Sequence, residues 1–420
     1  MHPLDRTQAP PSQLSSDYSL ARPEIFKLSG GKDLFAFRDL QQEAVKLELI
    51  FSSGKWHESK LGVSHFTAHM LSKGTTKKNS FQIAEGLDSL GAQWEVAPGF
   101  DFTSLSLFSL RKNLLTSLRI IIELLEGPSF DEGELRLLKE ISAQSLRVNN
   151  EKTNVVASKE IRKAVFGLHH PYGSSMEEAD IGNVSRVDLQ QFFSHHFSLH
   201  SVFLVGRLSD EEIRDVVNII PPLIARKEKD PDYEVVPGRS HTLTKPGGVQ
   251  ASIRLAKKCL SKTDSPEYFD AAMFNHMLGG FFGSRLMKNI REEKGLTYGI
   301  YSSLNHFLHS DFWMIGAEVS QKNAAEAVWE IKREIKMLQE EAIPPRELEV
   351  ARNYFIGSWQ SENSTLFAVA DKVKSLHLSG LSEGFYARLL EHIQHITPAQ
   401  IQFAANHYFD VGDLLEVQVG

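Results

Sequence analysis

The 420-residue sequence has little cysteine, no long apolar run and no excess of positive charge. Its one cysteine, Cys259, excludes an intrachain disulfide and a cysteine-cluster metal site, and it suits a reducing compartment. The apolar runs are too short to span a bilayer, so we expect no membrane segment. A net charge of -7 argues against nucleic acid as the main partner. The N-terminus lacks the apolar core of a signal peptide, which predicts a cytoplasmic protein, or a periplasmic one if a leader was removed.

What the chain does contain is typical of a globular protein with two domains. It is 41% hydrophobic and 24% charged, and it is long enough for two domains of about 200 residues. The Pro-rich, polar segment 1–28 is expected to form a flexible arm. A charged segment with Pro and Gly, 225–240, is the expected linker between an N-terminal domain, 29–224, and a C-terminal domain, 241–420.

A repeat supports this division. Residues 184–197 and 396–409 match at an offset close to half the chain length, and each begins with a residue that caps helices. Each repeat runs into an apolar stripe and is followed by an apolar strand ending in Val-Gly. A spacing of half the chain indicates a duplicated domain.

Hydrophobic periodicity places strands and helices in both halves. Strands are expected at 33–38, 44–51, 91–110 and 250–256, and further strands are expected to end at 319. Helices are expected at 63–73, 79–90, 114–125, 131–149, 267–278 and 323–341, and another helix begins at 344. Hairpins with few parallel crossovers predict an α+β fold, in which each duplicated domain is a mainly antiparallel sheet packed with helices.

Two histidines, His65 and His69, lie four residues apart within Gly62–Thr75. On a helix both imidazoles project from one face, at a spacing suited to one zinc ion. The segment reads His-x-x-Ala-His and resembles the inverted zincin motif His-x-x-Glu-His of the pitrilysin, insulinase and processing-peptidase family. In that family the glutamate is the general base that activates water. Ala68 stands at that position here, and a methyl group cannot accept a proton.

The resemblance implies a third zinc ligand on a later helix, in a context that Leu138-Lys-Glu-Ile141 matches. Glu140 is therefore the candidate that would complete a site with His65 and His69. The alternative is that Glu140 is an ordinary solvated carboxylate, so zinc binding stays open. The family's second glutamate falls on Gly133, with Glu132 and Glu134 shifted to either side.

The strand that binds substrate in the family also departs from the pattern. It corresponds to Gly91-Ala-Gln-Trp-Glu-Val-Ala-Pro98, where Glu95 replaces an asparagine. Pro98 removes a backbone N–H from an edge onto which a peptide would add as an extra strand.

The second half of the chain retains the C-terminal motif of the family that it resembles. Residues 277–301 resemble the family's C-terminal motif, whose functional arginine and tyrosine fall on Arg291 and Tyr298. In the family this pair binds the substrate backbone and stabilises the oxyanion, a task that suits guanidinium and phenol donors. Without the resemblance, Arg291 is consistent with an ordinary surface cation, and Tyr298 is consistent with a half-buried aromatic side chain on a strand.

Three functions remain open. The resemblance implies a clam-like chamber of two such chains, so an intact Arg/Tyr pair beside a broken zinc motif predicts a non-catalytic subunit. It would lend Arg291 and Tyr298 in trans to an active partner with intact His-x-x-Glu-His, for hydrolysis of peptides. One alternative is a homodimeric zinc peptidase with weak residual activity, whose water is activated by zinc alone, by Glu95 or by another carboxylate. The other is a peptide-binding scaffold without chemistry.

Overall fold

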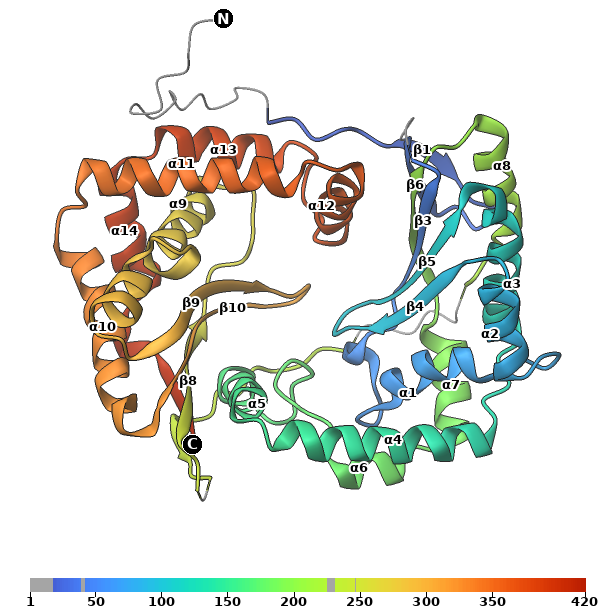
Figure 1. Cartoon of the computed structure of the whole chain (residues 1–420), viewed down its shortest axis with the longest axis horizontal. Coiled ribbons are helices and arrows are strands. Elements are labelled where there is room, and N and C mark those ends of the chain that lie inside the picture. Colours follow the sequence, from blue (N-terminus) through green and yellow to red (C-terminus); the bar gives the residue numbers. More distant parts are fainter. Residues whose placement is uncertain (1–17, 39–41, 225–230, 246) are drawn as a thin grey trace, which may run out of the picture.

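The computed structural model describes residues 18–38, 42–224, 231–245 and 247–420, which form two halves, each with one sheet and its helices (Figure 1). The N-terminal sheet has the order β1-β2-β6-β3-β5-β4. Its strands are β1 (Glu24–Lys27), β2 (Asp33–Arg38), β3 (Ala44–Phe51), β4 (Gln93–Pro98), β5 (Thr103–Leu110) and β6 (Leu199–Gly206). The C-terminal sheet has the order β7-β11-β8-β10-β9. Its strands are β7 (His241–Leu243), β8 (Gln250–Lys258), β9 (Thr297–His306), β10 (Asp311–Ser320) and β11 (Leu415–Val419).

Each half of the chain also has its own series of helices. The first half has α1 (Val63–Met70), α2 (Ser80–Asp88), α3 (Leu114–Glu126), α4 (Glu132–Asn150), α5 (Thr153–Phe166), α6 (Glu178–Asn183), α7 (Arg186–His196) and α8 (Asp210–Ile219). The second has α9 (Pro266–Asn275), the π-helical η4 (His276–Gly280) and η5 (Met287–Glu293), α10 (Ala324–Glu340), α11 (Pro345–Glu362), α12 (Leu366–Leu378), α13 (Phe385–His395) and α14 (Pro398–Tyr408).

The topology of the sheets matches the duplication that the repeat predicts. Strands β2-β6-β3-β5-β4 and β7-β11-β8-β10-β9 follow the same order, each with one parallel pair followed by antiparallel pairs. The repeated segments form α7 and α14, and both begin with a capping box, Ser185 with Asp188 and Thr397 with Gln400. The predicted α+β class, with a mainly antiparallel sheet in each half, is confirmed.

Two helices cross from one half to the other. Helix α5 of the N-terminal half packs on β8 and β11, where Ile161 shares a buried cluster with Ala256 and Val417. Helix α12 of the C-terminal half packs on β6, where Val369 shares a cluster with Phe203. Each sheet is therefore covered in part by a helix from the other half of the sequence.

The expected arm and linker are partly ordered. Residues 1–17 and 225–230 lie outside the described residues. Of the rest of the arm, Tyr18 is buried and residues 24–27 form β1, which pairs antiparallel with β2. In the linker, the Tyr233 hydroxyl donates to the carbonyl of Trp56 at 3.2 Å. Segments that looked polar and flexible thus have tertiary contacts.

The structure contains no membrane-spanning helix among the residues that it describes. None of the helices there combines the length and the apolar character that crossing a membrane requires.

Candidate functional site

The histidine pair lies on α1 as predicted. Gly62 caps the helix with φ 94, a left-handed conformation that favours glycine. The His65 and His69 rings are 4.5 Å apart. Burial lowers the pKa of His65 to about 4, with a contribution from His69, and burial also lowers the pKa of His69. Both imidazoles are therefore neutral near pH 7, as metal ligands must be.

Position 68 belongs to the core. Ala68 is fully buried in a cluster that includes Val63, Phe66 and Met70. No proton acceptor occupies the place at which the family motif has its base.

The expected third ligand lies on the wrong face of α4. Glu140 is exposed, whereas Leu146 is the α4 residue that lines a cavity together with His65. Six residues along a helix correspond to a rotation of about 240°. Across the described ranges, no three His, Cys, Asp or Glu side chains are grouped to hold a metal ion. His65 and His69 come together, but Glu140 does not join them, and the donors present do not fit zinc.

The other carboxylates near the motif in sequence have different surroundings. Glu132 is exposed in the first turn of α4, and so is Gly133. Glu134 accepts a hydrogen bond from the Ser80 hydroxyl at 3.0 Å. Glu95 is exposed on the edge strand β4.

Strand β4 offers a free edge that ends at Pro98. Gly99 donates to the carbonyl of Phe102 at 2.9 Å, so Gly99 and Phe102 form a hydrogen-bonded pair. The neighbouring pair, Pro98 with Thr103, is then non-hydrogen-bonded, and the nitrogen of Pro98 faces outward. Since proline has no N–H, pairing along this edge loses a donor at its end.

Arg291 lies on the π-helical segment η5. In the same segment Asn289 is buried and donates to Glu330 at 2.8 Å and to Glu334 at 2.7 Å, both on α10. The guanidinium carbon of Arg291 is 4.5 Å from the centroid of the Phe282 ring. π-Helical turns are rare and occur frequently at functional sites. Asn289 anchors the segment that carries Arg291 to α10, and Phe282 contacts the guanidinium itself. The sequence pattern predicted neither contact.

Tyr298 lies on β9, the free edge strand of the C-terminal sheet, and is 96% exposed. Arg291 and Tyr298 line the same open depression of about 730 Å³. The structure therefore brings together the two residues that the C-terminal motif singled out.

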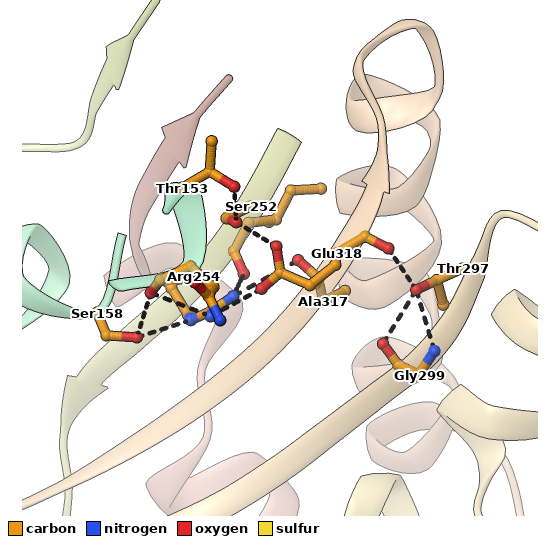
Figure 2. Close-up of polar contacts among 10 residues, drawn as sticks. Thr153, Ser158, Ser252, Arg254, Thr297, Gly299, Ala317 and Glu318 are labelled. Carbon is orange, nitrogen blue, oxygen red and sulfur yellow. Dashed lines mark hydrogen bonds and ion pairs between the residues drawn. The ribbon is translucent and has the colours of Figure 1, made fainter. Parts of the chain in front are cut away.

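Polar contacts hold β9 against the rest of the sheet (Figure 2). The Thr297 hydroxyl donates to the carbonyl of Glu318 and accepts from the N–H of Gly299 at 3.2 Å. The Glu318 carboxylate pairs with buried Arg254 at 2.9 Å, and Arg254 also reaches the Ser158 hydroxyl on α5 at 3.4 Å. The strand that presents the tyrosine is thus tied through β10 and β8 to a helix of the other half.

Sequence profiles of known families match two adjoining segments. A profile described as "Insulinase (Peptidase family M16)" matches residues 35–178, and one described as "Peptidase M16 inactive domain" matches residues 183–355. Together they cover most of the chain.

Curated relatives are similar over most of their length. A Bacillus subtilis protein called "Uncharacterized zinc protease YmxG" is 26% identical over 321 residues, 75% of this chain and 78% of the relative. A Helicobacter pylori protein called "Non-peptidase homolog YmxG" is 21% identical over 366 residues, 85% of this chain and 84% of the relative.

Solved structures share the fold. The "peptidase M16 inactive domain" from Pseudomonas fluorescens superposes with a TM-score of 0.83 at 22% identity, over 95% of this chain and 98% of that one. A protease from Helicobacter pylori gives a TM-score of 0.84 at 16% identity, over 96% of this chain and 100% of that one. With the two profiles, the α1 histidines and the Arg291–Tyr298 site, these likenesses lead to one assignment: the chain belongs to peptidase family M16, the insulinase family.

Proposed function

We propose that this chain is a non-catalytic subunit of an M16 peptidase. In this proposal it supplies Arg291 and Tyr298 in trans to the zinc site of an active partner, a similar chain with intact His-x-x-Glu-His. The observation that carries the proposal is the difference between the two sites. Ala68 is buried and none of the residues that the structure describes joins His65 and His69 as a third ligand, whereas Arg291 and Tyr298 share an open depression.

The chemistry of the second site suits this role. A guanidinium offers fixed donors to a peptide carbonyl or to the oxyanion that forms when water attacks it, and a phenol adds one more hydrogen bond. Arg291 is positioned by its segment and by Phe282, while Tyr298 is almost fully exposed on a free strand edge. A large aromatic side chain in that setting is available to a substrate or a partner.

The zinc in this proposal belongs to the partner. The homodimeric alternative needs a metal site within this chain, and the described donors around His65 and His69 do not provide one. The scaffold alternative keeps peptide binding but makes Arg291 and Tyr298 dispensable. One relative is called a "non-peptidase homolog", which supports the existence of chains in this family without their own activity.

Co-expression with the active partner tests the proposal. Arg291→Ala should lower the kcat of peptide hydrolysis by the complex roughly 100-fold, the loss typical of one oxyanion donor. Lys288→Ala, which removes an exposed cation from the same segment, is the matched control and should leave cleavage unchanged. Size-exclusion chromatography establishes that each variant still assembles. Equal cleavage by the Arg291→Ala and control complexes would refute the proposal and favour the scaffold.

A further inference from the structure

A second cavity, separate from the Arg291–Tyr298 depression, lies beside His65. Its volume is about 330 Å³, at the lower end of the range for ligand pockets. We call it the basic cavity because three of its lining side chains are cations. Besides the cations Lys55, Lys159 and Arg162, its lining includes His65 of α1, Leu146 of α4 and Pro98 of β4.

The basic cavity holds more positive than negative charge. Against Lys55, Lys159 and Arg162 it has one carboxylate, Glu58. One oxygen of Glu58 is occupied by the N–H of Ser64 at 2.9 Å and its hydroxyl at 2.6 Å. The cations in the cavity therefore outnumber its carboxylates.

The cations donate to neutral acceptors. Arg162 donates to the Ser158 carbonyl at 2.8 Å, and its buried Nε has no hydrogen-bond partner. Lys159 donates to the Asn150 side-chain oxygen at 2.8 Å. Burial lowers the pKa of Lys55 to about 8 and also lowers that of Arg162. Desolvated cations of this kind are stabilised by an anion placed among them.

The position of the cavity suggests what would carry that anion. Pro98 and Gly99 both line it, and Pro98 is where the free edge of β4 loses its outward N–H. A peptide that paired with the β4 edge would therefore stop pairing at the mouth of the cavity. Leu146, Phe100 and Met176 supply apolar walls, which strengthen ion pairing by excluding water.

We propose that the basic cavity binds the carboxylate at the C-terminus of a peptide that pairs in parallel with the edge of β4, because β4 runs toward the cavity at Pro98. The inference rests on the proposed peptide-handling function but not on Arg291, Tyr298 or a partner subunit. The guanidinium of Arg162 suits a carboxylate because its planar fork donates two parallel hydrogen bonds, and Lys55 and Lys159 add charge.

Fluorescence anisotropy on the isolated full-length chain tests this. The probe is a fluorescein-labelled hexapeptide of alternating valine and threonine, prepared as the free acid and as the C-terminal amide. The free acid should bind at least about tenfold more tightly, as expected for charge-assisted hydrogen bonds. Arg162→Gln and Lys159→Gln should each reduce this preference. Lys112→Gln, at an exposed cation outside the cavity, should retain it.

Several outcomes would overturn the inference. Equal binding of acid and amide, or no binding of either, would show that the cavity does not select a carboxylate. If inorganic phosphate displaced the peptide while the free acid and the amide bound equally well, the cavity would be a phosphate site instead. Lys159 is only half-buried, so Lys159→Gln keeps the test valid if Arg162→Gln fails to fold. The two proposals can fail separately. If the free acid binds more tightly than the amide but the Arg291→Ala complex cleaves peptides normally, this inference stands and the role in trans is rejected.

Discussion

Leu146 is the α4 side chain that lines a cavity with His65, and Glu140 is exposed on another face. Position 146 is thus the α4 position from which a side chain shares a cavity with His65. Leucine offers no metal ligand there, and Ala68 offers no base. Within the described part of the N-terminal half, neither position 146 nor position 68 offers a metal ligand or a proton acceptor.

Leu146→Glu should therefore create zinc affinity. The new carboxylate would share the cavity with His65, so a His₂Glu donor set becomes available. Equilibrium dialysis against zinc, followed by elemental analysis, should give close to one zinc per chain for this variant and well below one for the natural sequence. Glu140→Gln is the control and should have no effect. Zinc bound by the natural chain and lost in Glu140→Gln would contradict this account.

Most of the candidate residues followed from sequence motifs. His65 and His69 share one face of α1 because four residues make about one helical turn. Arg291 and Tyr298 lie on η5 and β9, and they line one depression only because of the tertiary fold. Glu140 was misplaced because the rotation of α4 against α1 is set by tertiary packing. Its sequence context, Leu138-Lys-Glu-Ile141, does not determine which face of α4 turns toward α1. The apolar residues Leu137 and Ile141 beside it are 51% and 53% exposed, so this side of α4 faces solvent.

Among the elements, α5 and α12 determine how the halves fit together, and the sequence pattern predicted neither. Both pack against a sheet that lies far from them in sequence, which no local signal encodes. By contrast, the strands β2 and β3 and the capped helices α7 and α14 match their predicted positions, because alternation and capping are local.

Charged contacts attach α12 to the N-terminal sheet. Lys374 donates to both oxygens of buried Glu48 on β3, each at 2.8 Å. Lys46 lies 3.2 Å from the same carboxylate and 2.9 Å from Asp371 of α12. The hydrogen bonds to Asp371 favour the charged form of Lys46 and raise its pKa, although burial opposes this.

Lys374→Ala should lower the free energy of unfolding by about 1–3 kcal/mol, because Glu48 stays buried with one cation fewer. Lys372→Ala on the same helix is the matched control. Its pairing with Glu362 at 3.4 Å is partly exposed, so its loss should cost less than about 1 kcal/mol. Urea denaturation of the two variants makes the comparison, and equal losses would mean that the Glu48 contact does not hold α12 in place.

At the scale of the whole molecule, the halves are interlocked. Each sheet is covered by a helix of the other half, and the β9–β10 and β4–β5 hairpins reach toward each other (Figure 1). Their tips touch where the N–H of Leu308 donates to Asp101 at 3.0 Å and the Phe100 and Phe307 rings lie 4.9 Å apart. The duplication predicts two domains, and in the structure the two halves are joined by these contacts and by α5 and α12.

The halves should therefore fail to fold separately. A fragment of residues 1–230 lacks α12, and a fragment of residues 231–420 lacks α5, so each leaves apolar sheet surface uncovered. Calorimetry should show one transition for the full chain, no cooperative transition for either fragment, and recovery of one when both are mixed. Two separate transitions in the full chain would contradict the interlocked arrangement.

The proposed non-catalytic role depends most on this chain having no metal centre of its own. The measurement that tests it most directly is the zinc content of the purified natural chain, with hydrolysis of a fluorogenic peptide recorded on the same sample. We predict zinc well below one per chain and no chelator-sensitive turnover. Close to one zinc per chain with turnover that a chelator abolishes would contradict the account and identify the chain as a homodimeric peptidase.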